Sequence, residues 1–178
     1  MSHYYELDGT KEKIFTLQCI ALSGREFSKE FSVGVRDGNS LYSQKEYWRL
    51  TKSTVSNGVL ELAIKIRNSY ESLGLNDKHN ILTCIEDNKV TRRDLIWVCN
   101  KIIHSKSFNL EPIGSHKDKE PLEWWNGDVR LTGAMNGKHW DISINVSEWL
   151  KSCLFYLQSL EECLIDHREK SRDLKRGI

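Results

Sequence analysis

The chain reads Asp128-Val-Arg-Leu-Thr-Gly-Ala-Met-Asn-Gly-Lys-His-Trp-Asp-Ile-Ser-Ile-Asn-Val146 at the point that decides its fold. Apolar and polar residues alternate on both sides of Asn136-Gly137, as strands with one buried face require. An Asn-Gly pair readily adopts the two positive-φ positions of a tight hairpin turn. The stretch therefore predicts a β-hairpin, and we expect a small antiparallel sheet around residues 128–146. A shorter alternation over residues 31–35 predicts a further short strand.

Helical patterns precede this hairpin. Apolar residues recur at helical spacing over residues 11–22 and again over residues 44–73. Ser43 and Glu46 form a capping box, because each side chain can accept a hydrogen bond from the other residue's backbone N–H. A helix is therefore predicted to begin near residue 44. Whether Asn57-Gly58 divides it into two helices stays open at this point.

A further helix follows the hairpin, over residues 147–165. Asn145 and Ser147 both offer side chains that can cap its first turn. Its apolar residues occupy more than one face, so we expect it to lie centrally in the fold. Residues 166–178 carry mixed charges without an apolar face and are predicted to form an exposed extension. The fold class is therefore α+β and predominantly helical, with one domain over residues 1–165.

The composition is typical of a globular protein. Of the 178 residues 39% are hydrophobic and 29% are charged, and the formal net charge of +1 creates no overall field for nucleic acid or anionic membranes. The five cysteines lack Cys-x-x-Cys spacing and most lie in apolar runs, which fits a reducing cytoplasm. No stretch approaches the roughly 18 apolar residues that span a bilayer, so we expect a cytoplasmic protein without a membrane partner.

Thr91 and Asp94 form a second capping signal, which predicts a helix over residues 92–105. At 100° per residue, its apolar side chains fall on one arc that would face the core. These residues are Leu95, Ile96, Val98, Cys99, Ile102 and Ile103.

Four other residues of this segment would form a stripe on the opposite side of the helix. Arg93, Trp97, Asn100 and His104 are spaced by four, three and four residues. Histidine titrates near neutral pH and arginine binds phosphate, so the stripe has groups for acid–base chemistry on RNA. An outward Trp97 also requires a partner.

The segment Cys99-Asn100-Lys-Ile-Ile-His104 resembles the HEPN superfamily. These are helical proteins of microbial defence and toxin systems, and their ribonuclease members carry Arg, a polar residue such as Asn, and His on one helix. The resemblance implies a metal-independent ribonuclease that acts through Arg93, Asn100 and His104, completed across a dimer axis. The family's arginine would fall at Trp97 or the two residues after it, so Arg93 stands earlier than the motif requires.

Two structural interpretations of these aromatic and polar residues stay open. The stripe can equally be covered by another element of the same chain, with His104 capping the last carbonyls of its helix. Trp124 and Trp125 occupy adjacent positions at a strand entrance, and adjacent strand positions face opposite sides. One ring should therefore point inward, while the other can anchor a partner.

Motifs for other chemistries are absent from the sequence. It contains no glycine-rich phosphate loop and no Gly-x-Ser-x-Gly elbow. His79 with Cys84, and Cys99 with His104, are pairs spaced by five residues without second pairs at zinc-ligand spacing. On a helix, Cys99 and His104 would diverge by about 140°. We therefore expect neither a metal site nor a cofactor.

Two functional hypotheses follow from the sequence. In the first, the chain is a non-catalytic protein-interaction module that contacts its partner through Arg93, Trp97, Trp124 and Trp125. It would be a small accessory subunit of a bacterial multi-protein assembly, of a phage-defence or toxin–antitoxin type if the family resemblance holds. In the second, it is the HEPN-like ribonuclease, with RNA as its partner. We favour the first hypothesis, because an acid–base site needs positioned partners and His104 stands alone. The oligomeric state stays open.

Overall fold

The structure is a computed structural model that describes residues 7–31, 41–73, 81–114 and 123–176. Within these residues the fold is α+β and predominantly helical, as the sequence predicts. The elements follow one another as α1 (Leu7–Glu30), α2 (Gln44–Leu73), β1 (Ile81–Glu86), β2 (Lys89–Asp94), α3 (Leu95–Ile103), β3 (Ser107–Gly114), β4 (Glu123–Met135), β5 (Lys138–Asn145) and α4 (Val146–Arg176). The strand predicted over residues 31–35 lies outside the described residues, apart from Phe31 at the end of α1.

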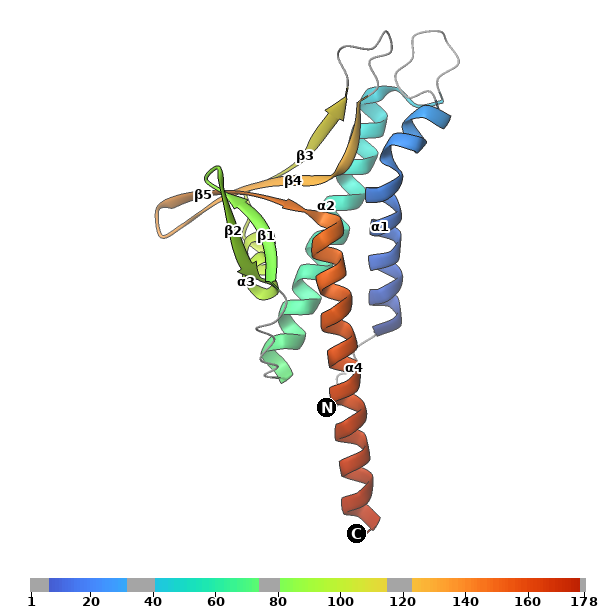
Figure 1. Cartoon of the computed structure of the whole chain (residues 1–178), viewed down its shortest axis with the longest axis vertical. Helices are drawn as coiled ribbons and strands as arrows, with labels where there is room; N and C mark the ends of the chain where they lie inside the picture. Colours follow the sequence, from blue (N-terminus) through green and yellow to red (C-terminus); the bar gives the residue numbers. More distant parts are fainter. Residues whose placement is uncertain (1–6, 32–40, 74–80, 115–122, 177–178) are drawn as a thin grey trace.

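The strands form one antiparallel sheet in the order β2-β1-β5-β4-β3 (Figure 1). The hairpin predicted over residues 128–146 is its β4–β5 pair, with Met135 opposite Lys138. Asn136 and Gly137 form the turn with φ angles of 52° and 75°, which confirms the prediction. The sheet is larger than the sequence indicated, because β1, β2 and β3 join this hairpin.

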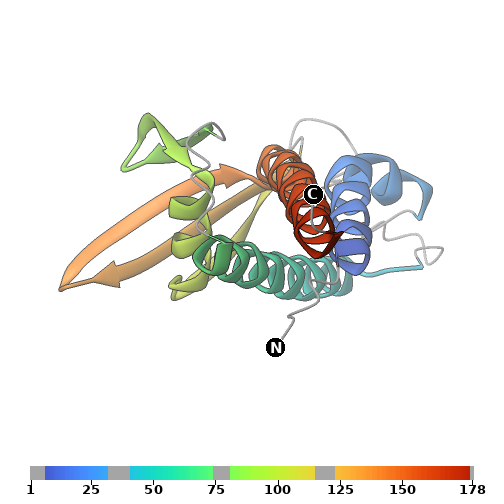
Figure 2. The ribbon, with the colours of Figure 1, turned by 90° about the horizontal axis from the view of Figure 1, so that it is seen from below.

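Alternation along the strands buries one face of the sheet. The residues of this covered face include Leu82, Cys84, Val129, Leu131, Ile142 and Ile144. Helices α3 and α4 pack against it, and α1 packs against the first half of β4 (Figures 1 and 2). On the opposite face, Thr83, Ile85 and Arg130 are exposed to solvent. Among the described residues, the sheet is therefore covered on one side and open on the other.

Helix α4 is central to the fold, as predicted from its several apolar faces. The buried side chains of Trp149, Leu150 and Tyr156 lie between the sheet and the other helices. Asn145 caps the helix, because its side-chain oxygen accepts a hydrogen bond from the Glu148 N–H at 3.1 Å. The helix continues through Arg176 and projects beyond α1, so residues 166–176 extend α4 as a single helix (Figure 1). None of the described helices has the length and apolar composition needed to cross a membrane.

Helix α2 is one continuous helix. The Ser43 N–H donates to a Glu46 carboxylate oxygen at 3.1 Å, and the Glu46 N–H donates to the Ser43 hydroxyl at 3.2 Å. The predicted capping box is therefore confirmed. Gly58 lies inside the helix, where a Cβ atom would stand 3.0 Å from the Leu17 side chain of α1. Gly58 thus serves the packing of α1 against α2 and does not break α2.

The prediction of a helix over residues 92–105 is wrong at its start. Lys89–Asp94 is strand β2, which pairs with β1 through a two-residue turn at Asp87-Asn88 with φ angles of 50° and 64°. Helix α3 begins only at Leu95, where the Asp94 side chain caps it by accepting the Trp97 N–H at 2.7 Å. Pairing with β1 in this hairpin overrides the helix start that Thr91 suggested.

The cysteines divide into two groups. Cys84, Cys99 and Cys153 are buried as free thiols, whereas Cys19 and Cys163 are exposed. Burial raises the pKa of Cys84 to about 11 and that of Cys99 to about 12. The buried thiols therefore pack as small apolar side chains and stay protonated at neutral pH.

Helix α1 approaches β4 closely at Gly24. A Cβ atom added there would stand 2.2 Å from the backbone oxygen of Trp125. Tyr47 of α2 completes the junction, because its hydroxyl accepts a hydrogen bond from the Trp125 N–H at 3.2 Å. The absence of a side chain at Gly24 therefore sets how closely α1, α2 and β4 approach one another.

The variant Gly24→Ala tests this junction. Helix propensity alone would make alanine more stable by about 1 kcal/mol at this helical position. The clash with Trp125 should reverse the sign and lower the free energy of unfolding by about 1–3 kcal/mol in urea titrations. Ser23→Ala, at the adjacent exposed position, is the control and should change it by less than about 0.5 kcal/mol. A Gly24→Ala protein at least as stable as the wild type would contradict the close approach.

Candidate functional site

Arg93 lies on strand β2, so it does not belong to a helical stripe with Trp97. The two residues nevertheless touch, because the Arg93 guanidinium carbon lies 4.7 Å from the centre of the Trp97 ring. The same guanidinium forms an ion pair with Glu86 of β1, whose carboxylate accepts from the Arg93 Nε at 3.2 Å. The sequence predicted the neighbourhood of Arg93 and Trp97, but through the wrong secondary structure.

Lys101 extends this arrangement along α3. Its Nζ lies 5.0 Å from the Trp97 ring centre and 4.3 Å from that of Trp140 on β5. Burial lowers the pKa of Lys101, while the charge of Glu86 acts in the opposite direction. We call Glu86, Arg93, Trp97, Lys101 and Trp140 the cation–aromatic ladder. Trp97 is partly buried and has its partners within the chain, so its presence does not by itself require another protein.

Asn100 and His104 lie toward the other end of α3. The backbone N–H of His104 donates to the Asn100 carbonyl at 3.0 Å, and the His104 side chain is exposed. Arg93 and His104 are separated by the whole helix, which at 1.5 Å per residue is roughly 15 Å. One chain therefore does not gather Arg93 and His104 at a single reacting bond. The ribonuclease hypothesis needs a second copy of the chain and stays a prediction.

The two adjacent tryptophans behave differently. Trp125 is only 1% exposed, and its indole N–H donates to the Asp128 carbonyl at 2.7 Å. Trp124 is partly exposed, and the Arg25 guanidinium carbon lies 5.7 Å from its ring centre. The prediction that one ring faces inward is confirmed. Of the two, only Trp124 reaches solvent, so Trp125 acts as a core residue rather than a partner contact.

The open face of the sheet carries the most exposed apolar pair on the strands. Ile85 of β1 and Val90 of β2 stand directly opposite each other in the register and are 48% and 75% exposed. Arg130 and Asp141 form a bidentate ion pair beside them on β4 and β5, with Nε to Oδ1 at 2.9 Å and Nη2 to Oδ2 at 2.6 Å. Hydrogen bonding to Arg130 lowers the pKa of Asp141. The face therefore combines apolar side chains with a fixed ion pair.

The open face is also hollowed. A depression of about 690 Å³ extends over strands β1, β3, β4 and β5 to the start of α4. Its charged lining residues are Asp87, Glu111, Asp128, Arg130, Asp141 and Glu148. Carboxylates outnumber the guanidinium, so the depression is negatively charged. Within the part of the chain that the structure describes, no cluster of three or more His, Cys, Asp or Glu side chains is placed to hold a metal ion.

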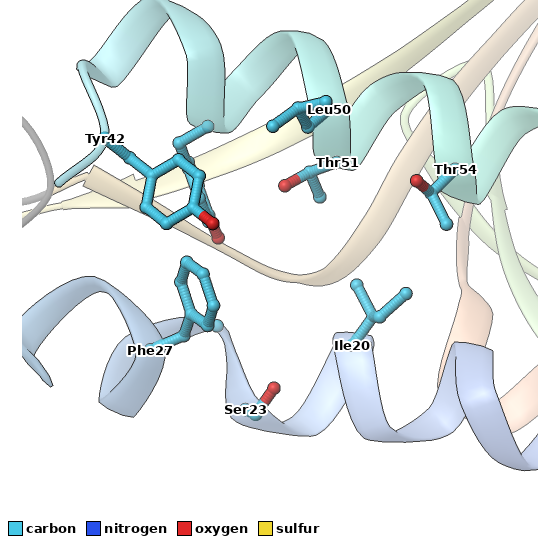
Figure 3. Close-up of a pocket in the computed structure, with 9 residues that line it drawn as sticks. Ile20, Ser23, Phe27, Tyr42, Leu50, Thr51 and Thr54 are labelled. Atoms are coloured by element: carbon cyan, nitrogen blue, oxygen red, sulfur yellow. The ribbon is translucent and has the colours of Figure 1, made fainter. Parts of the chain in front are cut away.

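A second cavity lies between α1 and α2 (Figure 3). Phe27 and Tyr42 face each other across it, with ring centres 5.8 Å apart, and Ile20 and Leu50 line its other end. Its volume is about 190 Å³. Pockets for small molecules usually enclose about 300–1,000 Å³, so this cavity suits no more than a single side chain.

Comparisons with known proteins identify no relative. No protein-family model matches the chain, and no curated protein or solved structure matches it. The resemblance of residues 99–104 to the HEPN superfamily therefore rests on the sequence motif alone.

The open face at β1 and β2 was not predicted from the sequence, although a signal for it was present. Asp87-Asn88 is a pair that tolerates positive φ, and Thr83, Ile85, Val90 and Arg92 alternate with their neighbours around it. The capping signal in the same segment concealed this hairpin, because Asp94 both ends β2 and caps α3.

A double-mutant cycle tests the cation–aromatic ladder. Combining Arg93→Gln with Trp97→Leu should give a coupling energy of about 0.5–1 kcal/mol in the free energy of unfolding, as expected for a partly exposed cation–π contact. Arg93→Gln combined with Trp124→Leu is the control pair, and these two effects should add. Additive behaviour of Arg93 and Trp97 would show that their stacking does not stabilise the fold.

Proposed function

We propose that this protein is a non-catalytic protein-interaction module that receives its partner on the open face of the sheet. The observation that carries the proposal is the exposed pair of Ile85 and Val90 beside a polar depression, on a sheet whose other face is covered by helices. An apolar centre with a polar surround is the usual composition of a protein interface. Such a module would act as an accessory subunit of a larger assembly.

The charge of this face favours a protein over a nucleic acid. Binding of a phosphate backbone requires several unpaired Lys or Arg side chains along one surface. Arg130 is instead paired with Asp141, and the carboxylates of Asp87, Glu111 and Asp128 add negative charge to the depression. RNA would be repelled from this part of the face.

Contacts between neighbouring elements hold side chains of the open face in place, which would lower the cost of binding. The bidentate pair of Arg130 and Asp141 joins β4 to β5, and the cation–aromatic ladder attaches β2 to α3. A partner would therefore meet side chains that are already ordered, so less conformational entropy is lost on association.

Site-specific photo-crosslinking in the native host tests the proposal. A photoreactive amino acid at Ile85 should give a discrete crosslinked complex with a defined protein. The control position is Leu22, which is 76% exposed on α1 and lies away from the sheet. Equal crosslinking from both positions, or none from Ile85, would overturn the proposed docking face. Crosslinking to RNA at Ile85 would instead direct attention to the ribonuclease hypothesis, to be tested by His104→Ala.

A further inference from the structure

The two edges of the sheet differ in their capacity to accept another strand. Edge strand β3 contains Pro112, which has no N–H, and its register with β4 shifts between Leu110 and Pro112. Prolines and bulges are common devices that prevent pairing at an edge. Edge strand β2 has neither, and its only paired neighbour among the described strands is β1. The β2 edge is therefore the one where strand addition is geometrically open.

The direction of the β2 backbone groups follows from the hydrogen bonds of β1. The Asp87 N–H donates to the Asp141 carbonyl of β5 at 3.2 Å. Successive residues of an antiparallel strand direct their backbone groups to opposite edges, so Glu86 faces β2. Its register partner Lys89 faces back toward β1. Val90, the next residue, therefore points its N–H and C=O away from the sheet.

Arg92 shares this outward direction with Val90, since the two are separated by one residue. Both side chains lie on the open face, where Ile85 stands opposite Val90 and Thr83 stands opposite Arg92. A strand arriving at this edge would meet two outward pairs of backbone donors and acceptors. Each antiparallel partner residue opposite Val90 or Arg92 would exchange two hydrogen bonds with it.

The charges on β2 select what kind of strand can arrive. Lys89 and Arg92 are exposed and form no ion pair within the described part of the chain, whereas Arg93 pairs with Glu86 and keeps 39% of its side chain exposed. Opposite charges at facing positions stabilise a strand pair, and like charges destabilise it. An incoming strand should therefore carry acidic residues opposite these three positions and an apolar residue opposite Val90.

A second copy of the chain fits this edge poorly. Two copies of β2 related by a two-fold axis normal to the sheet would oppose residues of the same face. In one register of the two strands, Lys89 lies opposite Arg93 of the other copy. In another register, Arg92 lies opposite Arg92 of the other copy, so like charges face each other in both registers. The register centred on Val90 avoids this, but it leaves half of the six-residue strand unpaired.

From this geometry we propose that the partner protein adds an acidic extended segment, antiparallel, to the free edge of β2. This inference rests on the proposed interaction function and names the partner's binding mode. Read opposite β2 from Arg93 to Lys89, the favoured partner sequence is Glu-Glu-Thr-Val-Glu. Its backbone binds Val90 and Arg92, its valine extends the apolar row of Val90 and Ile85, and its carboxylates pair with the basic side chains.

Binding of synthetic peptides to the full-length protein tests the proposal. A terminally blocked peptide containing Glu-Glu-Thr-Val-Glu should shift the backbone amide resonances of Val90 and Arg92 and slow their hydrogen exchange. The matched peptide Lys-Lys-Thr-Val-Lys should not bind. The variant Arg92→Glu should weaken binding of the acidic peptide by at least about tenfold.

Two substitutions at Val90 separate strand addition from other modes of binding. Val90→Pro removes the outward N–H but no bond to β1, so the β1–β2 hairpin should remain folded. Val90→Thr keeps the N–H and the β-branched shape. The acidic peptide should bind Val90→Pro about tenfold more weakly than Val90→Thr, as expected for the loss of a backbone hydrogen bond.

The possible outcomes distinguish this inference from the proposed function. Equal affinity of the two Val90 variants, or unchanged Val90 and Arg92 amides with the acidic peptide, would overturn strand addition. If Ile85 still crosslinks a protein in cells, the open face would remain the docking surface, but the partner would bind it without adding a strand to β2. If Ile85 crosslinks nothing, the proposed function itself fails.

Discussion

Burial of one face of the sheet under the helices is the constraint from which the other features of this molecule follow. The apolar residues of the covered face need a matching layer, and α4 supplies it with Trp149, Leu150 and Tyr156. No helix among the described residues is left to cover the other face, because α1 packs against α4 and β4, and α2 packs against α1, α3 and β3. The open face is therefore a consequence of how this chain distributes its apolar residues.

The covered side also holds the sheet edge in place. Strand β2 lies far from the centre of the core, and a two-stranded extension of this kind has little stability of its own. The ladder of Glu86, Arg93, Trp97 and Lys101 fixes it by stacking cations on an aromatic ring that α3 presents. A feature that the sequence suggested as a binding stripe thus has a structural role beside the free edge of β2.

The parts of the fold that sequence predicted well are those with local signals. Asn136-Gly137, the Ser43–Glu46 capping box and the cap at Asn145 each depend on residues within a few positions of one another. The error at Arg93 has a different origin. Arg93 belongs to strand β2, which is only six residues long and pairs with β1. A helical capping signal in the same segment obscured this short alternation. The free edge of β2 was also missed. An edge is defined by the lack of a paired strand beside it, and that depends on the order of strands in the whole sheet.

Burial shows a similar limit for single side chains. The pair Trp124 and Trp125 was expected to divide between inside and outside, but the sequence did not show which ring was which. The phase of β4 decides it, because Trp125 shares the alternation that buries Val129 and Leu131. What no local pattern encodes is the contact of Gly24 with the Trp125 backbone, which joins segments about a hundred positions apart in the chain.

Hydrogen exchange of the protein without any partner tests the central claim most directly. The Asp87–Asp141 hydrogen bond fixes which residues of β2 direct their backbone groups toward β1. If β2 is a free edge, the amides of Thr91 and Arg93, which face β1, should be protected from exchange. Those of Val90 and Arg92, which alternate with them, should exchange at rates close to those of an unfolded chain. Equal protection of all four amides would contradict the account, because the β2 edge would then already be occupied.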